Sequence, residues 1–89
     1  MHKYVVMAHA QGPEILAGEI TRIVLENDGD VISLVVTPNA PPVQRFDFVG
    51  VFDIGHIDAE AASSLDDQIK DLKNQGKAEE IETILQTHP

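Results

Sequence analysis

Residues 20–37 constrain the fold of this chain more than any other stretch. Two runs rich in apolar and β-branched residues flank the tetrapeptide Asn27-Asp28-Gly29-Asp30. Asp-Gly between alternating hydrophobic residues is a strong β-hairpin signal, because both residues tolerate the positive φ of a tight turn. The stretch therefore predicts two antiparallel strands joined at Asp28-Gly29.

The register of this predicted hairpin follows from its two turn residues and pairs Leu25 with Ile32. One face would then carry Ile23, Leu25, Ile32, Leu34 and Val36. The other would carry Ile20, Arg22, Val24, Glu26, Val31, Ser33 and Val35. A three-residue loop with a bulge is the alternative, but the first register segregates polar and apolar side chains better.

Two further strands and two helices complete the predicted order. Residues 3–10 predict a first strand, and the hairpin supplies strands at 15–26, bent at Gly18, and at 31–37. Residues 43–54 predict a fourth strand with Phe46, Phe48, Phe52 and Ile54 on one face. Capping residues from position 58 onward predict a helix that ends at Gly76, followed by a second helix.

This order predicts an α+β fold in one domain spanning residues 1–89. We expect a bent four-stranded antiparallel sheet, with the two C-terminal helices packed on the phenylalanine face. A small open barrel, closed by bends at Gly18 and Gly50, is the alternative.

Charge and cysteine content exclude several functional classes. Fifteen acidic residues against six basic ones give a net charge of −9, which repels nucleic acids and anionic membranes. The chain has no cysteine, so disulfides and thiolate chemistry are excluded. Because neither a signal peptide nor a long apolar run is present, we expect a cytoplasmic protein.

Three residues form the candidate ligand-binding set: His9, His56 and Asp58. His56 and Asp58 would project to the same side of an extended segment, and His9 at the end of the first strand could approach them. No histidine pair has the spacing of a helical metal site, and no serine lies in a catalytic motif. We therefore predict no catalytic residue, no metal and no cofactor.

The predicted function is that of a small, acidic, non-catalytic interaction protein, such as an inhibitor or accessory factor that binds a basic protein. The candidate partner-binding residues are Asp66, Asp67, Asp71, Glu79 and Glu80. The alternative is a small-molecule-binding protein or small enzyme that uses the sheet interior with His9 or His56. An acidic surface can also serve solubility alone.

The sheet face opposite the phenylalanines is predicted to be unusually apolar. A solvated antiparallel sheet normally alternates apolar and polar residues cleanly, and this one does not. An exposed apolar patch of this kind favours association, most simply about a two-fold axis. We therefore predict a homodimer, with the candidate interface formed by Val24, Val31, Val35, Val49 and Val51.

Overall fold

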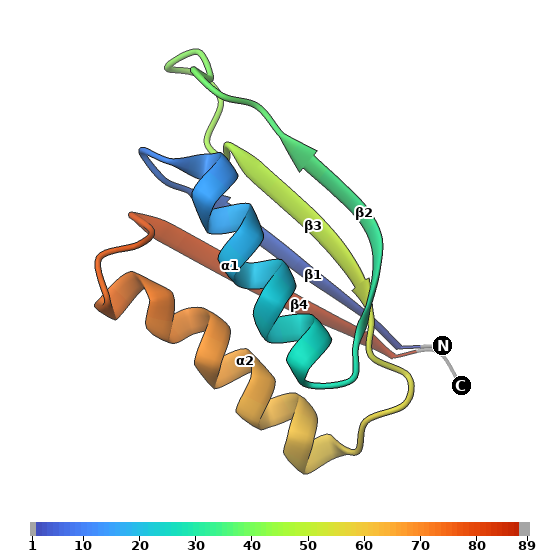
Figure 1. Ribbon diagram of the computed structural model, residues 1–89. Helices are drawn as coiled ribbons and strands as arrows, with labels where there is room; N and C mark the ends of the chain where they lie inside the picture. Colours follow the sequence, from blue (N-terminus) through green and yellow to red (C-terminus); the bar gives the residue numbers. More distant parts are fainter. Residues whose placement is uncertain (1, 88–89) are drawn as a thin grey trace.

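The computed structural model describes residues 2–87, which form a β-α-β-β-α-β sequence of elements. These are β1 (His2–His9), α1 (Pro13–Glu26), β2 (Asp30–Val36), β3 (Phe48–Asp53), α2 (Ala59–Asn74) and β4 (Glu80–Thr87). The strands make one antiparallel sheet in the order β2-β3-β1-β4. Both helices cover the same face of the sheet (Figure 1). This arrangement is the split βαβ, or ferredoxin-like, fold.

The hydrophobic core lies between the two helices and the covered face of the sheet. The β1 residues that point into it are Tyr4, Val6 and Ala8. They pair with the covered side of β3, where the rings of Phe48 and Phe52 lie on either side of Gly50. A Cβ atom at Gly50 would come within 2.7 Å of both rings, so glycine leaves the space that the two rings fill. The helices contribute Leu16, Ile20, Ile23, Val24, Leu65, Ile69 and Leu72.

Part of this architecture agrees with the prediction from the sequence. The α+β class, the four antiparallel strands and the two helices are confirmed. The order is not as predicted, because α1 lies between the first two strands and β4 follows α2. The sheet is open within residues 2–87, with β2 and β4 at its edges, so the barrel alternative is wrong.

The predicted strand over residues 15–26 is wrong, since this segment belongs to α1. Its buried side chains, Leu16, Ala17, Ile20, Ile23 and Val24, recur at helical spacing. Pro13 also occupies the first turn, where a proline favours a helix. Asp28 does adopt a positive φ of 64°, but the turn joins a helix to β2, and the predicted pairing of Leu25 with Ile32 does not form.

The predicted second C-terminal helix is also wrong. Gly76 follows α2 with a φ of 78°, as a helix-ending glycine should, but the chain then continues as β4. Tyr4 pairs with Leu85 and Ala8 with Ile81, so apolar side chains on β4 face the core at a period of two. The spacing of Ile81, Ile84 and Leu85 fits a helix and a strand alike, and β1 provides the ladder that selects the strand.

The predicted fourth strand is shorter than expected. β3 begins at Phe48, and residues 37–47 form a loop that carries Pro38, Pro41 and Pro42. Proline lacks a backbone N–H, which keeps this segment out of the ladder. Phe46 therefore lies outside the sheet, although Phe48 and Phe52 face the helices as predicted.

Candidate functional site

The face of the sheet that the helices leave uncovered is the first candidate. Register and alternation place six apolar side chains at its centre: Val5, Met7, Val35, Val49, Val51 and Ile84. We call this set the open face. Val35 is 55% exposed and Ile84 is 45% exposed, which is unusual for large apolar side chains in strands. Charged rows border it, with Lys3 and Asp53 at one end and His9 and Glu80 at the other.

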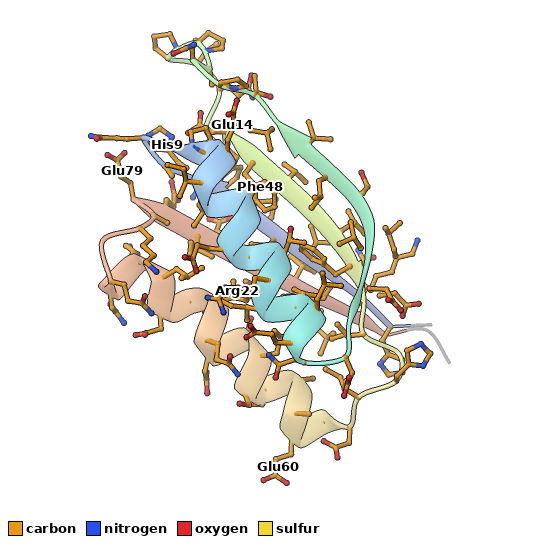
Figure 2. All side chains as sticks on the ribbon, viewed as in Figure 1. His9, Glu14, Arg22, Phe48, Glu60 and Glu79 are labelled. Carbon is orange, nitrogen blue, oxygen red and sulfur yellow. The ribbon has the colours of Figure 1, made fainter. Side chains whose placement is uncertain are left out.

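A polar cluster around His9 closes one end of the open face. The imidazole Nδ1 contacts the carboxylate of Asp47, and Nε2 lies 2.8 Å from Oε2 of Glu79. Figure 2 places His9 and Glu79 side by side at this end of the molecule. Both ring nitrogens of His9 therefore face carboxylates.

Asp47 is the buried member of this cluster, at 5% exposure. Its Oδ2 also accepts a 3.1 Å hydrogen bond from the backbone N–H of Ala10. The cluster therefore joins the end of β1, the segment before β3 and the segment before β4. Both nitrogens of His9 contact carboxylates, so the side chain links these segments and is not free to serve as a base.

Arg45 forms a second link between segments at the His9 end of the sheet. Its guanidinium binds the carboxylates of Glu80 and Glu82 on β4 and lies over the ring of Phe46, 4.9 Å from the centroid. The hydrogen bond from Arg45 lowers the pKa of Glu80. The loop before β3 is thus tied to β4 across the end of the sheet.

The second candidate is a groove between α2 and β4. Its larger part is a cavity of about 380 Å³ lined by Tyr4, Ile54, Ala59, Ala62, Ser63, Asp66, Lys70, Thr83 and Leu85. A smaller cavity of about 130 Å³ shares Ile54, Ala59, Ala62 and Leu85 with it and extends to Asp58. We refer to the two together as the α2–β4 groove. The larger volume lies within the range of ordinary ligand sites.

A partly buried hydrogen-bond chain forms the polar wall of this groove. The hydroxyl of Tyr4 donates to Oδ1 of Asp66 at 2.7 Å, and Nζ of Lys70 lies 2.8 Å from Oδ2. Burial, followed by the Asp66 carboxylate, raises the pKa of Tyr4 far above its usual value, so the hydroxyl stays protonated. Burial alone would raise the pKa of Asp66, but hydrogen bonds from Lys70, Thr83 and Tyr4 outweigh it and lower the pKa.

The candidate ligand set of His9, His56 and Asp58 is not brought together. Lys3 of β1 pairs with Asp53, just before His56, whereas His9 lies at the other end of β1, about 20 Å away along the strand. His56 is exposed, and its Nε2 lies 3.9 Å from Oδ2 of Asp30. Asp58 is the N-cap of α2 and accepts a 2.8 Å hydrogen bond from the N–H of Ala61.

The five predicted partner-binding acids do not form one helical surface. Asp66, Asp67 and Asp71 lie on α2, whereas Glu79 precedes β4 and Glu80 begins it. Glu79 and Glu80 are engaged by His9 and Arg45. Asp71 accepts hydrogen bonds from Asn74 and Gln75 at the end of α2, which lower its pKa.

The predicted interface valines divide into two groups. Val35, Val49 and Val51 lie together on the open face. Val24 is fully buried in α1, so its placement on the exposed face was wrong. Val31 pairs with Phe52 and therefore lies on the helix-covered side, also contrary to the prediction. The first error follows from the strand assigned to residues 15–26. The second follows from the register shift between Val31 and Ser33, which puts Val31 on the opposite side of β2 from Val35.

Sequence reasoning missed three residues that shape these sites. Asp47 was not among the predicted site residues, although a lone carboxylate between Phe46 and Phe48 is a signal of a buried polar group. The roles of Tyr4 and Ser63 leave no local signal in the sequence, because they depend on how α2 packs over the sheet.

Within residues 2–87, no group of three or more histidine or acidic side chains could hold a metal ion. No helix in the same range is long and apolar enough to cross a membrane.

Comparisons with known proteins establish similarity of fold alone. No family model matches the chain, and no curated protein matches it. The solution structure of the C-terminal domain of the MgtC protein from Mycobacterium tuberculosis superimposes with a TM-score of 0.54. The match covers 98% of this chain and 87% of that one, at 12% identity. It supports the β-α-β-β-α-β architecture, and a shared architecture does not imply a shared function.

A second solved structure matches this chain over only about a quarter of that structure's own length. It is the crystal structure of an amidase of the hydantoinase/carbamoylase family from Burkholderia multivorans. The match has a TM-score of 0.43 and 16% identity, and covers 99% of this chain but 26% of that one. A match at this level does not establish a common fold.

Proposed function

We propose that this protein is a non-catalytic interaction protein that forms a homodimer through the open face and binds a basic protein with its acidic outer surface. The observation that carries the proposal is the open face itself. Six apolar side chains form its centre, and no helix covers them. An apolar centre with a charged border is the anatomy of a protein interface.

The broad face of the molecule sets an upper limit on the area that a dimer could bury. The molecule is a slab with extents of 38 × 24 × 16 Å, and the shortest dimension is the thickness of the two layers. Its broad face measures 38 × 24 Å, or about 900 Å², as an upper bound. A standard interface buries about 800 Å² per partner, so most of the sheet face would be needed.

The distribution of charge favours pairing of the sheet faces in particular. Acidic side chains on the uncovered side of the sheet lie toward its margins, at Asp53, Glu80 and Glu82, whereas α1, α2 and the adjoining turns carry most of the acids. In a face-to-face dimer the helix layers point away from each other, so the net charge of −9 opposes association weakly. The same arrangement leaves the acidic helices exposed to a basic partner.

Light scattering on the wild type and two valine variants tests the dimer. Val35→Glu puts a charge on the open face, and Val43→Glu makes the same change in the loop, where Val43 is 93% exposed. At about 50 μM, a concentration at which a micromolar dimer is mostly assembled, we expect dimers for the wild type and Val43→Glu and a monomer for Val35→Glu. A monomeric wild type refutes the dimer, and a dimeric Val35→Glu moves the interface elsewhere.

A further inference from the structure

We propose that the α2–β4 groove binds an extended segment of the basic partner, which pairs with the free edge of β4. This inference rests on the proposed interaction with a basic protein and names the contact surface and the chemistry of the segment. The segment would continue the sheet beyond β4, and alternate side chains would enter the cavity beneath α2. Strand addition beside a helix-lined groove is an established mode of peptide recognition.

The edge of β4 lacks most of the features that protect a sheet edge, and its charged residues, Glu80 and Glu82, lie in its first half. Natural edges are blocked by charged side chains, especially lysine, by proline, by bulges or by covering elements. β4 contains neither lysine nor proline, and it pairs with β1 without interruption from Glu80 to Thr87. The opposite edge differs, because the pairing of β2 with β3 shifts between Val31 and Ser33, which marks a bulge at Ile32. Backbone groups on the outer side of β4 are therefore available to a further strand.

The groove provides space for side chains on the covered side of an added strand. The cavity of about 380 Å³ lies beside Thr83 and Leu85, the β4 residues whose side chains face α2. Leu85 remains 50% exposed even though it lies on this side. Ala59, Ala62 and Ile54 make the remaining wall apolar, so an aliphatic side chain fits. Such a side chain would cover the apolar surface that α2 leaves uncovered.

Charge on the other side of the sheet defines the alternating residues of the segment. Glu80 and Glu82 project from β4 toward the open-face side, and they share the single guanidinium of Arg45. The two carboxylates outnumber that guanidinium by one, and Lys73 and His9 lower the pKa of Glu80 less than Arg45 does. Side chains of an added strand alternate between faces, so aliphatic residues toward the groove would alternate with lysine or arginine toward these glutamates.

Two labelled peptides test this chemistry. The first is a fluorescein-labelled heptapeptide, Lys-Val-Lys-Leu-Lys-Val-Lys, and the second is the same peptide with alternate backbone nitrogens methylated. Methylation removes N–H donors while it keeps every charge and side chain. By fluorescence anisotropy we expect the first to bind with a dissociation constant below about 1 mM and the second at least about tenfold more weakly.

Two adjacent serines of α2 provide the matched protein variants. Ser63 lines the groove, whereas Ser64 is exposed outside it and accepts a hydrogen bond from Gln68. Ser63→Leu fills the groove, and we expect it to weaken binding of the first peptide about tenfold. Ser64→Leu makes the same change at the adjacent position outside the groove and should alter the dissociation constant by less than about twofold. Backbone amide shifts on adding the peptide should be largest for residues 81–86.

Three results would overturn the inference. They are no binding of the first peptide, equal binding of the methylated peptide, and equal effects of the two serine variants. Equal binding of the methylated peptide would mean attraction by charge alone. A fall in mass on adding the peptide would place the β4 edge in the dimer and would contradict the open-face interface. A monomeric wild type that still binds the peptide, and loses it in Ser63→Leu, would contradict the dimer and support the groove.

Discussion

Replacement of Tyr4 by phenylalanine tests the polar wall of the α2–β4 groove. The substitution removes one hydroxyl and keeps the ring, which is buried in the core at 2% exposure. That hydroxyl donates a 2.7 Å hydrogen bond to Asp66, and hydrogen bonds to charged groups contribute about 1.5–3 kcal/mol. The side chain of Asp66 is 26% exposed, so we expect the lower end of this range, a loss of about 1.5–2 kcal/mol at pH 7.

The same interaction should depend on pH with a defined sign. The pKa of Asp66 is lowered below 3.8 in the folded protein, because hydrogen bonds from Lys70, Thr83 and Tyr4 exceed the effect of burial. The ionised Asp66 carboxylate therefore contributes fully to stability above the pKa that it has in the unfolded chain, about 4. This contribution is lost as the pH falls through the pKa of Asp66 in the folded protein. Tyr4→Phe removes one of these donors, so its cost should be larger at pH 7 than below about pH 3.

Urea denaturation followed by circular dichroism measures both effects. Wild type, Tyr4→Phe, Asp66→Asn and the double variant are compared at neutral and acidic pH. The protein concentration is held constant, because association adds to apparent stability. The double variant should lose less than the sum of the single changes, since the two side chains share one interaction. A cost below about 0.5 kcal/mol at pH 7, or an equal cost at both pH values, refutes the reasoning.

Two further matched comparisons use the same assay at pH 7. Gly50→Ala should lower the free energy of unfolding by about 1–3 kcal/mol, because the added Cβ would meet the Phe48 ring at 2.7 Å. Gly18 is an exposed helix position where an added Cβ would meet no neighbouring group within 4 Å, so Gly18→Ala should raise the free energy of unfolding by about 0.5–1 kcal/mol. Asp47→Asn should cost about 2 kcal/mol by removing the buried charged partner of His9, while Glu79→Gln, at an exposed pair, should cost less than about 1 kcal/mol. A destabilising Gly18→Ala, or equal costs at Asp47 and Glu79, would contradict these expectations.

Local sequence signals were sufficient where one periodicity dominated. The phenylalanines of β3 alternate at period two, and the capping residues before α2 precede a clear helical stripe at Leu65, Ile69 and Leu72. The segment of α1 was predicted as a strand because it is rich in β-branched residues, which favour strands: Ile20, Thr21, Ile23 and Val24. Burial of the α1 stripe against the sheet outweighs that preference, which is worth only tenths of a kcal/mol per residue.

The candidate sites were harder to predict than the elements, because they depend on strand order. His9 was identified, but its partners Asp47 and Glu79 meet it only because β1 lies between β3 and β4. That order was not predictable once the segment after Gly76 was assigned to a second helix. The excess of valine on one sheet face was visible from alternation alone, and three of the five predicted interface residues do share the open face.

An isotope-filtered nuclear Overhauser measurement tests the dimer most directly. Protein labelled with carbon-13 at its methyl groups is mixed with unlabelled protein, so that only contacts between different copies are recorded. We expect intermolecular contacts from the methyl groups of the open face: Val5, Met7, Val35, Val49, Val51 and Ile84. The proposed interface is contradicted if no intermolecular contact appears at concentrations where the mass is dimeric, or if the contacts come from α1 or α2 instead.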